Sequence, residues 1–101
     1  YQQAMGRIEE VINTEPFADK WKAFGWTVVD VEDGNNHEQL RKAFEVDSNG
    51  KPKVIIARTI KGKGVSFMED NLLWHYRDPQ GEDYENALKE VEEKYAKSCN
   101  R

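Results

Sequence analysis

The chain has 101 residues, which is enough for one small domain and too few for two. Its 15 Lys and Arg and 19 Asp and Glu give a net charge of −4, whereas a nucleic-acid-binding domain carries a basic face. No apolar run approaches the roughly 20 residues that a membrane-spanning helix needs. One cysteine, Cys99, excludes an intrachain disulfide and fits a reducing compartment. We therefore expect a cytoplasmic protein that binds neither nucleic acid nor a membrane.

The first clear helical pattern begins at Thr14. This residue can cap a helix whose first turn holds Glu15 and Pro16, and Gly25 is suited to end that helix. Apolar side chains recur at helical spacing between these ends, at Phe17, Trp21 and Phe24. We expect these three side chains to form one buried face, with Trp21 in the core.

A strand, a helix and a second strand follow. Residues 26–31 are rich in β-branched residues and predict a strand, and residues 33–35 predict a turn. Asn36 with Gln39 is a capping-box pattern. The helix after it has its apolar side at Leu40, Ala43 and Phe44. Residues 54–57 form a continuous apolar run, typical of a parallel strand covered on both faces.

The last element is a long helix after an irregular segment that reaches Asp83. Its apolar positions repeat at helical spacing, at Tyr84, Leu88, Val91 and Tyr95. We expect its acidic residues Glu90, Glu92 and Glu93 to lie on a solvated face. The predicted order is α-β-α-β-loop-α, an α/β fold with a partial parallel sheet and flanking helices.

The segment Lys61-Gly62-Lys63-Gly64 follows the second predicted strand, where open α/β sheets bind ligands. Glycines let backbone amides approach an anion, and the two lysines add positive charge. The spacing is not that of a P-loop. Two interpretations stay open: a site for an anion such as phosphate, and a glycine-rich turn with solvated lysines.

The two histidines have different surroundings in the sequence. His75 has aromatic neighbours on both sides and is either a packed core residue or an acid/base group. His37 falls in the first turn of a predicted helix, where we expect it to be exposed. The histidines are far apart, and no metal site is predicted from them.

Several segments together resemble the C-terminal part of the thiamine-diphosphate-binding domain of transketolases. The similarity runs through residues 18–26 (ADKWKAFGW), 31–34 (VEDG) and 51–69 (KPKVIIARTIKGKGVSFME), and ends at Trp74-His75. It covers nearly the whole chain, and most resembles members in which this domain is an N-terminal subunit or section. It implies that residues 1–101 form a single partial domain of that fold.

The resemblance implies a cofactor site. Lys61 matches a lysine at the cofactor, and His75 matches a histidine that reaches the diphosphate and the reacting centre. A diphosphate needs cationic and N–H partners, and a proton must move during the reaction. Gly62 and Gly64 would keep the backbone close to the cofactor.

The chain also departs from the family pattern. Asn35 stands where many members have a histidine, and Tyr76 stands where many have a glycine. The Gly-Asp-Gly motif and the later Asn that hold Mg²⁺ in the family have no match here, so we assign no metal ligand and expect the chain to begin just after that motif. The pyrimidine-binding domain or subunit is also missing.

The resemblance implies part of a homo-oligomeric enzyme that moves a two-carbon ketol unit between sugar phosphates with thiamine diphosphate and Mg²⁺. We expect the chain alone to bind the cofactor poorly and to be inactive. Two alternatives remain. One is another thiamine-diphosphate enzyme, which makes 1-deoxyxylulose 5-phosphate or decarboxylates 2-oxo acids. The other is a non-catalytic α/β module that binds an anion or a protein.

Overall fold

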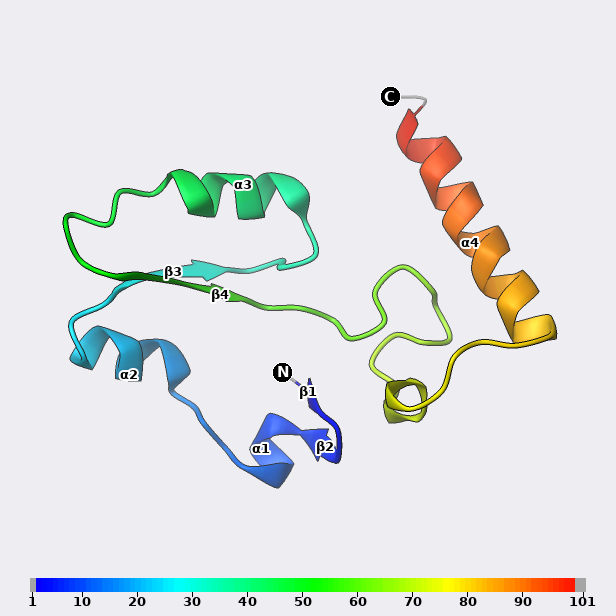
Figure 1. Ribbon diagram of the computed structural model, residues 1–101, viewed down its shortest axis with the longest axis horizontal. Coiled ribbons are helices and arrows are strands. Elements are labelled where there is room, and N and C mark those ends of the chain that lie inside the picture. The colour runs from blue at the N-terminus through cyan, green and yellow to red at the C-terminus, as the bar shows by residue number, and fades with distance from the viewer. Residues whose placement is uncertain (1, 100–101) are drawn as a thin grey trace. The chain divides into compact units, whose positions relative to one another are not determined.

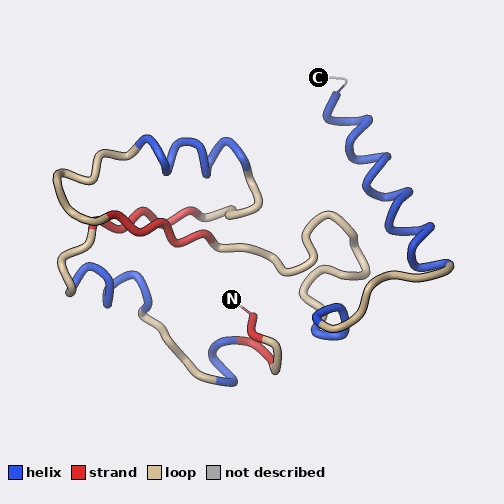
Figure 2. The backbone as a smooth tube through the Cα atoms, viewed as in Figure 1, coloured by secondary structure: helices blue, strands red, loops and turns tan. Residues whose placement is uncertain are grey.

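A computed structural model describes residues 2–99 of the chain, which divides into two compact units, residues 1–60 and 61–101 (Figure 1). The first unit contains β1 (Gln2–Gln3), β2 (Gly6–Arg7), α1 (Ile8–Val11), α2 (Phe17–Ala23), β3 (Thr27–Val31), α3 (His37–Glu45) and β4 (Lys53–Ala57). The second contains the 3₁₀-helix η1 (Leu72–His75) and α4 (Glu82–Cys99). Most of the segment between β4 and α4 is loop (Figure 2). That one domain spans residues 1–101 stays a prediction.

The centre of the first unit is a β-α-β arrangement. Strands β3 and β4 pair in parallel, with register from Thr27 opposite Lys53 to Val31 opposite Ala57. Helices α2 and α3 lie on opposite sides of this pair (Figure 1). The buried apolar core consists of Val31, Ala43 and Ile56. The predicted α/β fold with a partial parallel sheet is confirmed.

Helix α3 is anchored at both ends. The Asn36 side chain accepts a hydrogen bond from the Gln39 N–H at 3.1 Å, which confirms the predicted N-cap. The Gln39 side chain accepts from the Asp33 N–H at 3.0 Å, so it fastens the preceding turn instead of closing the capping box. At the other end, the Lys53 ammonium donates to the carbonyls of Phe44 and Val46 at 2.8 and 2.9 Å. These carbonyls have no partner within the helix, so Lys53 ties the helix end to β4.

Helix α2 begins later than predicted. Its first helical residue is Phe17, so Thr14 is too far away to cap it. Pro16 is the N-cap residue and provides no side-chain cap, and the Glu15 carboxylate accepts from the Phe17 N–H at 3.1 Å. The helix ends at Ala23, and Gly25 has a φ of +85°, as expected of a glycine after a helix.

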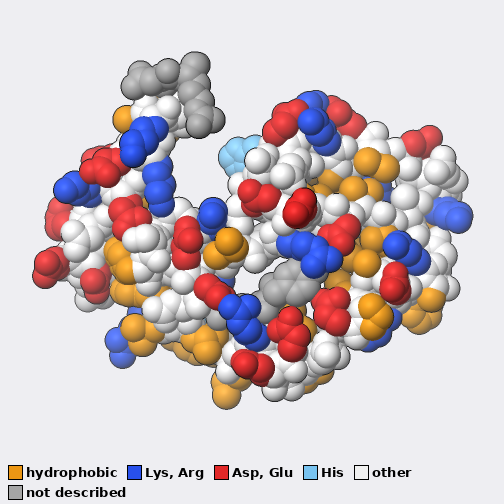
Figure 3. Space-filling view, turned by 180° about the vertical axis from the view of Figure 1, so that it is seen from behind, with side chains coloured by type: hydrophobic (Ala, Val, Ile, Leu, Met, Phe, Trp, Pro, Cys, Tyr) orange, Lys and Arg blue, Asp and Glu red, His pale blue; other side chains and the backbone are white. Residues whose placement is uncertain are grey.

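Several predicted core positions are exposed. Phe24 is 84% exposed and Phe44 is 70% exposed. On α4, Ala87 is buried, whereas the four predicted apolar positions are exposed: Tyr84, Leu88, Val91 and Tyr95. Hydrophobic side chains accordingly lie among charged ones on the molecular surface (Figure 3). A helical pattern predicts which residues share a face, but burial requires another element to cover that face.

The N-terminal elements are too short for sequence periodicity to predict. Strands β1 and β2 pair antiparallel through Gln2 with Arg7 and Gln3 with Gly6, and α1 follows at once. Two-residue strands show no alternation, and a four-residue helix shows no repeated face. None of the helices within residues 2–99 is both long and apolar enough to cross a bilayer.

Candidate functional site

Residues 61–70 form a closed loop at the start of the second unit, here called the lysine loop. The Asp70 N–H donates to the Lys61 carbonyl at 2.8 Å and joins the two ends. A second bond, from the Met68 N–H to the Val65 carbonyl at 3.0 Å, tightens its far side. Lys61 is half-buried, and its ammonium makes no ion pair among the described residues. The loop therefore presents one cation that an anionic ligand can use.

The conformation of the loop explains Gly62. Its φ is +74°, and a Cβ there would lie 2.4 Å from the Met68 carbonyl oxygen. Any other residue would therefore combine a strained backbone with a clash. Gly62 is required by the loop's own packing. Whether it also approaches a cofactor stays a prediction.

A carboxylate of the protein lies where an anion was expected. The Gly64 N–H donates to Glu69 Oε1 at 3.1 Å, and the Lys63 ammonium lies 4.0 Å from the same oxygen. Neither interpretation from the sequence included this contact. Lys63 and Gly64 do form an anion-binding arrangement, and the anion that they hold is Glu69 of the same loop.

Helix α4 contacts the lysine loop through its charged side. The Glu90 carboxylate accepts from the Ser66 N–H at 2.7 Å and from the Ser66 hydroxyl at 2.6 Å. The Lys94 ammonium donates to the Gly64 carbonyl and lies 3.5 Å from Glu90. The hydrogen bonds from Ser66, helped by Lys94, hold the pKa of Glu90 below its ordinary range. Glu90 lies on the predicted acidic face of α4 and, beyond that prediction, bonds to Ser66.

His75 is the last residue of η1. The Asn71 side chain caps this helix by accepting from the Leu73 N–H at 3.0 Å. The Trp74 indole N–H donates to the Phe67 carbonyl at 3.2 Å and ties η1 to the lysine loop. His75 itself is exposed, with its ring centroid 4.5 Å from that of Tyr76. The packed-core interpretation of His75 is therefore wrong, and its imidazole is accessible to a ligand.

The turn after β3, predicted at residues 33–35, is bonded to the segment that follows β4. The Gly34 N–H donates to the Arg58 carbonyl at 2.8 Å, and a Cβ on Gly34 would lie 2.8 Å from that of Ala57. The Asn35 side chain accepts from the Ile60 N–H at 2.9 Å. The turn is thereby fixed to the segment just before Lys61. The sequence predicted the turn but not this bond of Asn35, because Asn35 and Ile60 lie 25 residues apart.

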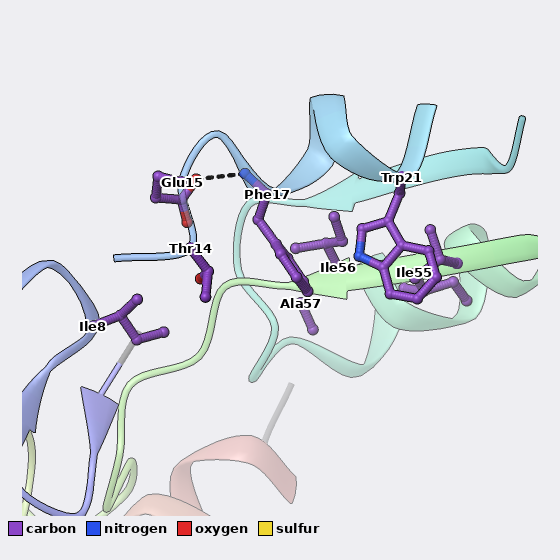
Figure 4. Close-up of a pocket in the computed structure, with 9 residues that line it drawn as sticks. Ile8, Thr14, Glu15, Phe17, Trp21, Ile55, Ile56 and Ala57 are labelled. Atoms are coloured by element: carbon purple, nitrogen blue, oxygen red, sulfur yellow. Dashed lines mark hydrogen bonds between the residues drawn. The ribbon is translucent and has the colours of Figure 1, made fainter. Parts of the chain in front are cut away.

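The first unit has an apolar cavity of about 450 Å³. Phe17 and Trp21 line it from α2, opposite Ile55 and Ala57 of β4 (Figure 4). Glu15 lies at its edge, and its Oε1 is buried without a hydrogen-bond partner. The cavity contains neither Lys61 nor His75, so it is separate from the residues predicted to bind the cofactor.

The family of the chain follows from comparison with known proteins. The protein-family model described as the thiamine diphosphate binding domain of transketolase matches residues 4–95 of the chain. The chain belongs to the transketolase family. This confirms the resemblance seen in the sequence and assigns the match to the cofactor-binding domain.

The curated relatives are transketolases and transketolase subunits. One subunit of the apulose-4-phosphate transketolase of Phocaeicola vulgatus is 41% identical over 96 residues, which cover 94% of this chain and 34% of that protein. The 6-deoxy-6-sulfo-D-fructose transketolase subunit SqwG of Clostridium sp. is 40% identical over 93% of this chain and 34% of its own length. Human transketolase is 41% identical over 59 residues, 9% of its length. The chain thus spans about a third of the subunits that it matches.

The residues of this transketolase-family chain fit part of the cofactor. Lys61 supplies a cation without an ion pair among the described residues, which suits a diphosphate. His75 supplies an exposed imidazole, which suits a proton transfer. Within residues 2–99, no group of three His, Cys, Asp or Glu side chains could hold a metal ion. No described residue is assigned as a ligand of Mg²⁺.

Proposed function

We propose that the protein is part of a transketolase that moves a two-carbon ketol unit between sugar phosphates with thiamine diphosphate. The observation that carries this proposal is the Lys61 ammonium, presented on a closed glycine-containing loop in the family's cofactor-binding domain. When bound, the cofactor supplies the carbanion chemistry of the transfer. The protein supplies binding, orientation and proton movement.

Each proposed site residue has one task. Lys61 donates hydrogen bonds from its ammonium to diphosphate oxygens, since charge-assisted bonds to phosphate are strong. His75 binds a diphosphate oxygen and carries a proton at an imidazole nitrogen near the reacting centre. Histidine side chains are suited to proton transfer near neutral pH. Gly62 and Gly64 keep the loop backbone close to the cofactor.

The complete enzyme requires more than this chain. Relatives that are each named as one subunit of a transketolase support a partner that contributes the pyrimidine-binding domain. The same names, apulose 4-phosphate and 6-deoxy-6-sulfo-D-fructose, support an anionic sugar as substrate. We further propose that the enzyme is a homo-oligomer, that it lies in the cytoplasm, and that residues outside this chain bind Mg²⁺. The chain alone has little or no activity.

Substitutions in the complete enzyme test the site. Lys61→Ala and His75→Ala should lower the transfer rate from xylulose 5-phosphate to an aldose phosphate, or weaken cofactor binding, without unfolding the protein. Lys89→Ala, which removes a charge from exposed α4, is the matched control for Lys61→Ala. Full rates in both site variants would show the assignment to be wrong.

Calorimetry tests the incompleteness of the chain. Thiamine diphosphate with Mg²⁺ is titrated into the isolated chain and then into the complete enzyme, which includes the partner subunit. Binding is expected only in the second titration. Micromolar binding by the isolated chain would contradict the proposal that the partner is required.

A further inference from the structure

We infer that Glu90 of α4 positions the lysine loop for anion binding, an inference that rests on the function proposed above. Glu90 touches no predicted ligand group itself. It acts through Ser66, which lies between Lys61 and Asp70, the two ends of the loop. It is therefore a positioning residue.

The contact between Glu90 and Ser66 uses both carboxylate oxygens. Oε2 accepts from the Ser66 N–H at 2.7 Å, and Oε1 accepts from the Ser66 hydroxyl at 2.6 Å. Two charge-assisted hydrogen bonds to one residue fix its orientation as well as its position. The lowered pKa of Glu90 agrees with a carboxylate that stays ionised in this contact.

A second contact lies one helical turn further along α4. The Lys94 ammonium donates to the Gly64 carbonyl and lies 3.5 Å from the Glu90 carboxylate. Residues four apart share one face of a helix, so Glu90 and Lys94 hold the loop together. Ala87 is the one buried residue of α4 within the described part of the chain. The attachment of the helix to the loop thus depends on these polar contacts.

The closed loop links Ser66 to Lys61. The Lys61 carbonyl accepts from the Asp70 N–H, and Gly62 lies directly against the Met68 backbone. A loop joined at its ends and packed internally has little freedom to absorb a shift at Ser66. Release of Ser66 should therefore loosen the backbone that carries Lys61.

Two variants distinguish the effect of losing the Glu90 contact with the loop from the effect of losing a negative charge on α4. Glu90→Gln and Glu93→Gln each remove one negative charge from α4, but Glu93 is exposed and only Glu90 has a described bond to the loop. The probe is inorganic pyrophosphate, titrated into the complete enzyme with this part of it ¹⁵N-labelled. Glu90→Gln should weaken pyrophosphate binding about five-fold, the equivalent of one lost hydrogen bond, while Glu93→Gln leaves it unchanged. The amide resonances of Ser66 and Gly64 should shift only in Glu90→Gln.

The outcomes that contradict this role are specific. The inference is overturned if Glu90→Gln binds pyrophosphate as tightly as Glu93→Gln, or if the Ser66 amide resonance does not move. Lys61→Ala serves as a separate test of the proposed cofactor contact. If it leaves the affinity unchanged while Glu90→Gln lowers it, the role of Lys61 is contradicted, and so is the inference that Glu90 acts by positioning Lys61.

Discussion

The carboxylate of Glu69 accepts a hydrogen bond from the backbone N–H of Gly64, with 3.1 Å between Oε1 and the nitrogen. The Lys63 ammonium lies 4.0 Å from the same oxygen. The groups that a phosphate oxygen would use thus already hold an anion of the same loop. An anionic ligand at Gly64 must displace Glu69 or bind beside its negative charge.

The first prediction concerns Glu69. Glu69→Gln keeps a side-chain oxygen that can accept from Gly64 but removes the charge that repels an incoming anion. The affinity of the complete enzyme for pyrophosphate should rise about three-fold, the size expected of one partly screened charge. NMR titration measures it, with Glu93→Gln as the charge-matched control. Equal affinities in the two variants would show that Glu69 does not compete with the ligand.

The second prediction compares two glycines with almost the same backbone. Gly62 and Gly50 have φ values of +74° and +73°, but only Gly62 has backbone atoms within 4 Å of an added Cβ. Gly50→Ala should lower the free energy of unfolding by about 1 kcal/mol, the cost of a left-handed alanine. Gly62→Ala should cost about 3 kcal/mol, since a clash with Met68 adds to the strain. Urea unfolding followed by circular dichroism measures both, and equal losses would contradict the packing shown for Gly62.

The third prediction concerns pH. Arg58 donates to both carboxylate oxygens of Asp30, at 3.0 and 2.7 Å, and these bonds hold the pKa of Asp30 below its ordinary value of 3.8. Because the pKa of Asp30 is lower in the folded state than in the unfolded state, the ion pair gives its full stabilisation at pH values above the unfolded-state pKa. This stabilisation is lost as the pH falls through the lower, folded pKa.

Asp30→Asn tests this dependence. At pH 7 the variant should be less stable by about 0.5 kcal/mol, because the pair is partly exposed. The difference from the unsubstituted chain should shrink as the pH falls below about 4. Urea midpoints between pH 7 and pH 3 measure it, with Glu32→Gln as an exposed control at the end of β3. A difference that stays constant with pH would show that the pair does not stabilise the fold through ionisation.

The fourth prediction concerns Trp21 and Leu88, which both occupy the apolar faces of helices predicted from the sequence. Trp21 packs its ring edge-on against Phe17 and Trp26, with centroids 5.9 and 4.7 Å away. Trp21→Ala should cost about 2 kcal/mol, less than a fully buried tryptophan, because its ring also borders the cavity. Leu88 is 40% exposed, so Leu88→Ala should cost less than about 1 kcal/mol. Thermal unfolding of the chain measures both, and a larger loss for Leu88→Ala would mean that α4 is covered in solution.

Local patterns predicted α2, β3, α3, β4 and α4, but none of β1, β2, α1 and η1. The Asn36 cap, the two β-branched strands and the position of Gly25 each depend on residues close in sequence. The predicted start of α2 was wrong, because the helix begins at Phe17, three residues after Thr14. Glu15, and not Thr14, lies within reach of the Phe17 N–H.

The sequence by itself determined the α/β class, the family and the candidate residues Lys61 and His75. Periodicity and short motifs depend on the order of neighbouring residues, which the sequence contains in full. Tertiary structure alone decided that Leu88 is exposed and that Glu90 binds Ser66, 24 residues away in sequence. Burial and long-range hydrogen bonds depend on which elements meet in space, so no local pattern could show that Glu69 and α4 hold the loop that carries Lys61.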